Sequence, residues 1–365
     1  MPKLKITKQY AKEFDDKCAK ADSHGFLRFF TKRDANNRSL LDLIALVEDT
    51  IKIKPTKHDR YAELNEQKIS NCVNEFFSLY MPQKAEEVRR IFNRTHPYFI
   101  DQDGITHINF IHTQQGDPHS SNVGHSGRCS FLEFNVYIHN SLDDLRTTAH
   151  ELTHALSSHH QHVIETLRSN VPIREIDNYA HKNFEKDCVG EIESYITEKL
   201  FNKFLFQKGI YTIEDLENYE NQQQASLLTE INLIREERDI IKKLSCPVSY
   251  ENLKKLVAEL QRNRHSRLIE RIRKMHDDNK CSSYMFRYVV GRIVADQWIK
   301  RFDKAQDHQT QLDMLDKFQN YLDRTHEFNL DRACENLLGE NFASIVEAYV
   351  MDKTNEAINL DEKAL

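Results

Sequence analysis

Glycine and proline are scarce in this sequence of 365 residues, which has 9 glycines and 7 prolines. These two residue types form most tight turns. A β-sandwich or a doubly wound sheet needs many such turns, so the composition argues against both architectures. The surplus of lysine, glutamate, asparagine and glutamine instead predicts a mainly α (α+β) fold built from long helices.

Paired cysteines are also missing. The seven cysteines stand singly along the chain, with no C-x-x-C pair and an odd total. This usage indicates a protein of a reducing compartment rather than one held together by disulfides.

Long apolar runs and an excess of basic residues are absent as well. Nowhere do about 18 uncharged apolar residues follow one another, and the amino terminus MPKLKITKQYAKEF lacks an apolar signal core. We therefore expect no membrane span, no Sec signal and a cytoplasmic location. Translocation into a host cell by a dedicated secretion system stays open, because its address lies outside these patterns. The net charge of -6 argues against a nucleic-acid partner.

Apolar residues at helical spacing occupy both ends of the chain. Residues 1–100 contain segments such as KISNCVNEFFSLYM, in which apolar residues recur every three or four positions. Residues 211–365 repeat this pattern with many interspersed charges, as in LTEINLIREERDIIKKL. We predict a helical N-terminal region, a core region at 101–210 and a large helical C-terminal lobe.

The 101–210 region contains two segments with the character of β-strands. The first is ITHINFIH (105–112), and the second, SFLEFNVYI (130–138), alternates apolar and polar side chains. Between them lies TQQGDPHSSNVGHSGR (113–128), which predicts a long loop. We expect a small antiparallel sheet in which 130–138 is an edge strand that leads into the next helix.

That next helix carries the motif HELTH. Two acidic residues follow a capping residue at Asn140 or Ser141, and an apolar stripe continues to Leu156. At about 100° per residue, His150 and His154 lie about 40° apart on one face, so their imidazoles can reach one metal ion.

Glu151 projects beside this pair, where it can contact an activated water without being a ligand. Chance places such a pentapeptide in about 7% of shuffled versions of a chain with this composition, so the surroundings must decide. Of the 18 histidines, 11 lie between residues 107 and 181, and the motif falls on a well-patterned helix. These features favour a Zn²⁺ site.

A zinc enzyme needs a third protein ligand, and two residues compete for this role. His160 has the spacing of H-E-x-x-H-x-x-G-x-x-H enzymes, but Ser157 replaces the glycine that turns the chain there. If the helix continues, His160 points about 80° away from His150. Glu191 is the preferred ligand, because in DCVGEIESYITEKLF it shares one helical face with Ser194 and Glu198.

These motifs resemble a known family. HELTH followed by EIESYITE is similar to the glutamate-zincins (gluzincins): thermolysin-type enzymes use E-x-x-S-D, and thimet-oligopeptidase-like peptidases use E-x-x-S-x-x-x-E. The resemblance implies a zincin-like catalytic core in which the first glutamate of the second motif, Glu191, is a zinc ligand. Thr153 stands where the oligopeptidases have the glycine of H-E-x-G-H, and this chain is much shorter than theirs.

A later fragment, YMFRYVVGRIVADQW (284–298), is similar to the tyrosine-rich helix of the same oligopeptidases. Tyrosines of that helix stabilise the reacting carbonyl group, so the resemblance implies such a role for Tyr288 or Tyr284. Tyr179 and His181 are further candidates. The alternative is a helix that packs its aromatic residues into the core.

The predicted function is a zinc metallopeptidase that hydrolyses a protein or peptide substrate. Zn²⁺ held by His150, His154 and Glu191 would activate a water, Glu151 would act as general base, and Tyr288 would stabilise the developing charge. Two alternatives remain open. One is a non-catalytic helical interaction protein or effector with an incidental H-E-x-x-H, and the other is a zinc enzyme that cleaves another kind of bond.

Overall fold

A computed structural model describes residues 4–23, 42, 46–48, 50–51, 60–93, 105–112, 122–126, 131–169, 184–244, 248–277, 283–323 and 329–364. The expectations for Tyr179 and His181 lie outside the described residues. The backbones of His160 and Tyr284 are described, but their side chains are not, so the expectations for these side chains also lie outside the described residues.

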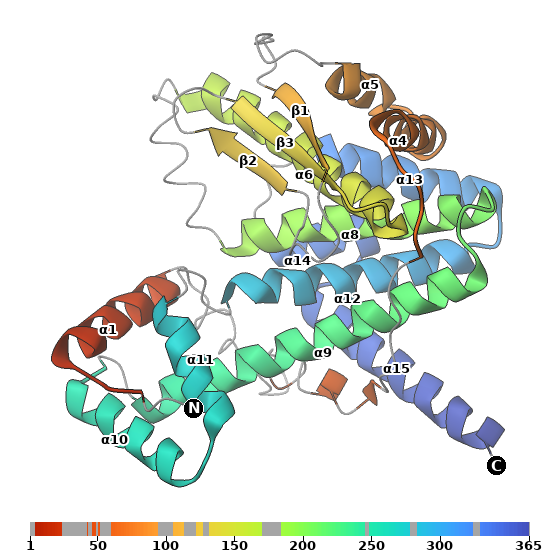
Figure 1. Cartoon of the computed structure of the whole chain (residues 1–365). Coiled ribbons are helices and arrows are strands. Elements are labelled where there is room, and N and C mark those ends of the chain that lie inside the picture. The colour runs from red at the N-terminus through yellow and green to blue at the C-terminus, as the bar shows by residue number, and fades with distance from the viewer. Residues whose placement is uncertain are drawn as a thin grey trace.

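The chain is mainly helical, as the composition predicts, with one small sheet (Figure 1). The helices are α1 (Lys8–Ser23), α4 (Glu66–Tyr80), α5 (Ala85–Asn93), α6 (Leu142–Ser169), α8 (Phe184–Gln207), α9 (Ile213–Leu244), α10 (Tyr250–Arg262), α11 (Ser266–Asp277), α12 (Ser283–Lys304), α13 (His308–Asp323), α14 (Leu330–Leu338) and α15 (Phe342–Ala364). The strands are β1 (Ile105–His112), β2 (Asn122–Ser126) and β3 (Phe131–Ile138). None of the helices, within the residues described, is both long and apolar enough to cross a membrane.

The sheet has the strand order β1-β3-β2 and is mixed rather than antiparallel. β1 runs parallel to β3, while β2 runs antiparallel to β3. A direct hairpin between the two predicted strands would have made them antiparallel. The stretch at 113–128 is long enough to cross over and contains a strand of its own, so β1 and β3 can lie parallel.

The prediction of β3 as an edge strand is wrong. β3 is the central strand, and β2, which lies within the expected loop, forms one edge of the sheet. The alternation of apolar and polar residues in β3 could not reveal this, because a central and an edge strand of a sheet with one buried face share that pattern. β3 does lead directly into α6, as expected.

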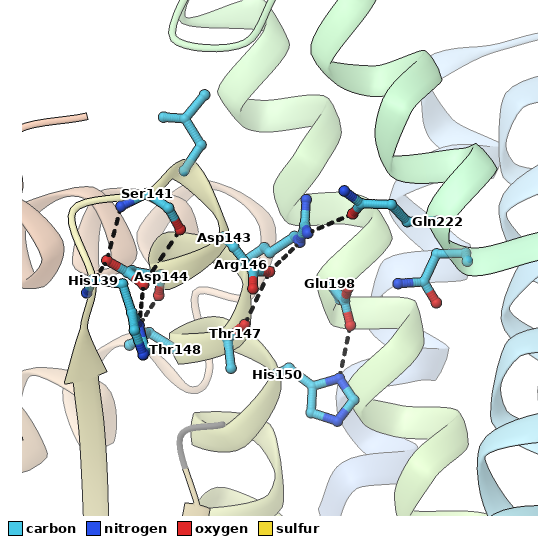
Figure 2. Close-up of polar contacts among 12 residues, drawn as sticks. His139, Ser141, Asp143, Asp144, Arg146, Thr147, Thr148, His150, Glu198 and Gln222 are labelled. Carbon is cyan, nitrogen blue, oxygen red and sulfur yellow. Dashed lines mark hydrogen bonds and ion pairs between the residues drawn. The ribbon is translucent and has the colours of Figure 1, made fainter. Parts of the chain in front are cut away.

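The Asp144 carboxylate fixes the start of α6. Asp144 Oδ2 accepts the backbone N–H groups of Ser141 at 3.1 Å and His139 at 2.8 Å, as Figure 2 shows. The side chain thus satisfies backbone donors of the residues that directly precede the helix. Asn140 instead adopts a left-handed conformation (φ 60°), and its side-chain oxygen accepts the N–H of Leu64. The strand-to-helix corner is therefore fixed from both sides.

α8 is the central helix of the structure. It packs against α6 on one side and α12 on another, and α14, α4 and α9 also contact it (Figure 1). Every residue from Glu191 to Leu200 is buried. The polar face of this helix, which would usually be solvated, is thus inside the protein and opposite the HELTH helix.

A second apolar cluster lies away from this centre. α1, α10 and α11 pack together with the C-terminal end of α9, at the lower left of Figure 1. The chain turns between α10 and α11, where Arg264 adopts a left-handed conformation (φ 57°). α1 thus packs beside elements of the C-terminal lobe, while α4 contacts α6 and α8. The division at residues 100 and 210 stays a prediction.

Candidate metal centre

α6 and α8 bring the two sequence motifs together. His150 and His154 lie one turn apart on α6, and their ring centroids are 5.0 Å apart. Glu191 approaches from α8, with its Oε2 atom 3.5 Å from His150 Nε2 and 3.6 Å from His154 Nε2. One potential ligand atom from each residue lies within 4.8 Å of the others.

These distances fit a small divalent cation. Two nitrogen or oxygen ligands at about 2.05 Å from a tetrahedral zinc ion would lie about 3.3 Å from each other. The Glu191 Oε2 atom is buried and accepts no hydrogen bond from the described residues. Because a buried carboxylate oxygen without a partner is costly, the arrangement suits a cation between the three side chains.

Glu198 orients one of the imidazoles. Its Oε2 atom lies 2.8 Å from His150 Nδ1, as Figure 2 shows, so that His150 Nε2 faces Glu191. A carboxylate on the far nitrogen of a metal-binding histidine fixes its tautomer and increases its basicity. The E-x-x-S-x-x-x-E spacing thus places Glu191 beside both imidazoles and Glu198 behind one of them.

The electrostatics around His150 and Glu191 favour positive charge. Burial lowers the pKa of His150, but the nearby Glu191 carboxylate and the hydrogen-bonded Glu198 carboxylate outweigh burial and raise the pKa to about 10. Burial raises the pKa of Glu191, yet His154, His150 and Arg287 hold it well below its usual range. Two ionised carboxylates stabilise a proton on this imidazole. The same negative charge would stabilise a divalent cation beside it.

Glu151 lies next to His150 on α6 and is half-buried. Burial raises the pKa of this carboxyl group, against the lowering effect of His154 and His150. A carboxylate with a raised pKa is better able to take up a proton near neutral pH. Its environment therefore suits the predicted general base.

α12 packs against α8 and carries Arg287 and Tyr288. Arg287 Nε lies 3.2 Å from Glu191 Oε1, and its Nη2 donates to the Tyr288 hydroxyl at 2.7 Å. Tyr288 is half-buried against the main core. The predicted helix at 284–298 is present, and one arginine joins its tyrosine to Glu191.

Gly291 allows α12 to approach α8 this closely. A Cβ atom at this position would lie 2.6 Å from Tyr195 Cδ2 and 2.9 Å from both Cβ and the carbonyl oxygen of Glu191. The Tyr195 ring in turn stands edge-on to the His150 ring, with centroids 5.0 Å apart. Gly291 therefore permits the contact that sets the position of Glu191 and supports His150.

His160 lacks the chain turn that its ligand role requires. α6 continues without a break from Leu142 to Ser169. Ser157, which occupies the position of the turning glycine, donates a hydrogen bond to the buried carboxyl group of Glu193. Burial raises the pKa of Glu193 to about 8, although the hydrogen bond from Ser157 opposes the rise. The bond ties α6 to α8 just beyond the HELTH segment.

Arg287, Gly291 and the pair Ser157–Glu193 are structural features of the site that the sequence patterns did not indicate. Arg287 and Gly291 are four residues apart, so they share the face of α12 that meets α8. The sequence signal for this contact was a basic residue one turn before a glycine within a helix. It could be interpreted only once the partner helix was known.

Comparison with known proteins supports the fold. No protein-family model and no curated protein sequence matches the chain. Among solved structures, a protein from Bacillus anthracis str. Ames described as an oligoendopeptidase F is similar, with 11% identity and a TM-score of 0.52. The match covers 99% of this chain and 58% of that one.

A protein from Chlamydophila abortus described as a peptidase also matches, with 12% identity, a TM-score of 0.46, and coverage of 98% of this chain and 56% of that one. This chain therefore spans less than two thirds of either structure. At such identity the Bacillus anthracis structure establishes the overall fold alone. This chain therefore shares its overall helical fold with that Bacillus anthracis protein.

Proposed function

We propose that this protein is a zinc-dependent metallopeptidase of the gluzincin type. The observation that carries the proposal is the convergence of His150, His154 and Glu191 on one point, with Glu198 behind His150. Two histidines and one glutamate form the protein ligand set of several catalytic zinc sites, which leave a fourth position open. The fold shared with an oligoendopeptidase F-like structure agrees with this function.

Zn²⁺ bound there would supply Lewis-acid polarisation of the scissile carbonyl and a water of lowered pKa. Glu151 would take the proton of the attacking water and later deliver it to the leaving amine. The Tyr288 hydroxyl would donate to the oxygen of the substrate carbonyl as negative charge develops on it. Glu198 would hold His150 in the orientation that its ligand role requires.

The edge of the sheet offers a place for the substrate backbone. β2 pairs with β3 on one side only, and its outer edge has no strand partner in the part of the chain that the structure describes. An extended peptide can add to such an edge through main-chain hydrogen bonds. We assign the substrate backbone to the edge of β2, which also contacts α6, rather than to 130–138, the segment expected to be the edge strand.

Metal analysis and a comparison of cleavage products test the function. We expect one tightly held zinc ion per chain. A peptide mixture or proteome digested with the wild type should contain new termini by mass spectrometry that the Glu151→Gln variant produces about 10² to 10⁴ times more slowly. Glu217→Gln, an exposed change on α9, is the control and should cleave as the wild type does. Equal rates for Glu151→Gln and wild type would refute the assignment of the base, and absence of zinc would refute the function.

A further inference from the structure

Arg287 occupies a central position between the candidate ligand and the candidate carbonyl-stabilising tyrosine. It lies on α12, one turn before Gly291, whose backbone lies close to Tyr195 and Glu191 of α8. Its side chain is 17% exposed, and the Glu191 side chain that it meets is 3% exposed. The guanidinium contacts Glu191 at 3.2 Å and donates to the Tyr288 hydroxyl at 2.7 Å.

The two carboxylate oxygens of Glu191 have different surroundings because of this contact. Oε1 faces the Arg287 guanidinium, whereas Oε2 faces the Nε2 atoms of both histidines at 3.5 and 3.6 Å. A carboxylate with two open oxygens can bind a metal ion through both. An arginine on one oxygen leaves the other as the sole ligand atom and fixes its direction.

The same guanidinium orients Tyr288. Its Cζ atom lies 4.7 Å from the centre of the Tyr288 ring, while Nη2 donates to the phenolic oxygen. Because that oxygen accepts from Arg287, the hydroxyl proton is directed toward another acceptor. A planar guanidinium can hold an ion pair with the carboxylate at one edge and donate to the phenol at another, whereas a lysine ammonium on a flexible chain cannot hold both groups in a fixed arrangement.

We propose that Arg287 is a positioning residue of the active site: it holds Glu191 as a ligand through one oxygen and directs the Tyr288 hydroxyl toward the substrate. The inference rests on the proposed zinc peptidase function. It goes beyond that function because it links the metal ligand and the group that would stabilise the substrate carbonyl through one side chain.

The test uses the full-length chain with Zn²⁺ and Co²⁺ as probes. We expect Arg287→Gln to bind Zn²⁺ about 10 to 100 times more weakly, as is typical when a group that holds a metal ligand is lost. The visible absorption of the Co²⁺ form should change as well, because a second carboxylate oxygen alters the coordination geometry. Arg287→Lys keeps the positive charge and should retain most of the zinc affinity, with an altered Co²⁺ spectrum and a lower kcat at little changed KM.

Arg301→Gln is the matched control. Arg301 lies on the same helix and pairs with Glu340 at 2.9 Å, away from the residues of the metal centre. It should leave the Zn²⁺ affinity, the Co²⁺ spectrum and turnover unchanged. If Arg287→Gln does not fold, the lysine variant decides the question through its spectrum and its kcat.

Wild-type zinc affinity and a wild-type Co²⁺ spectrum in both Arg287 variants would overturn the role of Arg287 and leave the zinc peptidase proposal intact. If the wild-type chain itself binds neither Zn²⁺ nor Co²⁺, the proposed function fails and this inference fails with it. The two failures are therefore distinguished by the wild-type protein alone.

Discussion

Replacement of Gly291 by alanine tests whether the close approach of α12 to α8 sets the metal centre. The added Cβ would lie 2.6 Å from Tyr195 Cδ2 and 2.9 Å from two atoms of Glu191, one of which is its backbone oxygen. Non-bonded carbon atoms prefer about 3.5–4.0 Å, so these groups must separate by about 0.5–1 Å. Backbone atoms of α8 cannot yield without a shift of the helix that carries Glu191.

The magnitude follows from two opposing effects. Overpacking of a dense interior costs about 1–3 kcal/mol, while alanine in place of glycine within a helix stabilises by up to about 1 kcal/mol. We expect a net loss of about 1–2 kcal/mol, which for a chain of this length lowers Tm by about 1–3 °C. Ligand geometry must hold to within about 0.5 Å, so zinc affinity should fall about tenfold or more.

Gly190→Ala provides the matched control for Gly291→Ala. Gly190 is also helical and adjoins Glu191, but its added Cβ would lie 3.8 Å from the nearest atom, His154 Nδ1, which is an ordinary contact. This variant should be as stable as the wild type or up to about 1 kcal/mol more stable, with unchanged zinc affinity. Calorimetry and zinc titration against a chelator measure both quantities. Equal zinc affinity and equal Tm for the two variants would refute the steric argument.

Three further predictions concern the same centre. Glu191→Ala should lose most bound zinc while His160→Ala retains it; metal analysis showing the reverse would restore His160 as the third ligand. Glu198→Ala should weaken zinc binding about 10 to 100-fold, because His150 loses the carboxylate that orients it, and an unchanged dissociation constant would contradict this role. Addition of zinc at about 100 times its dissociation constant should stabilise the metal-free protein by about 2.7 kcal/mol, and calorimetry showing no rise in Tm would argue against a preformed site.

Local patterns in the sequence predicted the elements that hold the centre. The spacing in HELTH places two imidazoles on one helical face, and α6 carries them there. The spacing from Glu191 to Glu198 predicted a shared face, and both carboxylates do face His150. These relations depend on neighbours within one or two helical turns, so geometry along a single helix is enough to predict them.

The arrangement of the sheet could not be predicted in the same way. A short strand in the Gly/Ser/His-rich stretch has too few residues for a clear alternating pattern. The sequence therefore did not predict β2, and without β2 it could not predict that β3 is the central strand. Which strand lies at an edge depends on hydrogen bonds between segments that are distant in sequence.

The sequence by itself determined the helical character of the chain and the faces on which its histidines and glutamates lie, because both follow from periodicity and propensity along a single segment. Only the tertiary structure decided that the polar face of α8 is buried against α6 and that Arg287 and Gly291 of α12 meet Glu191. Packing between helices depends on how side chains from separate segments fill a common space. That information is absent from any one stretch of sequence.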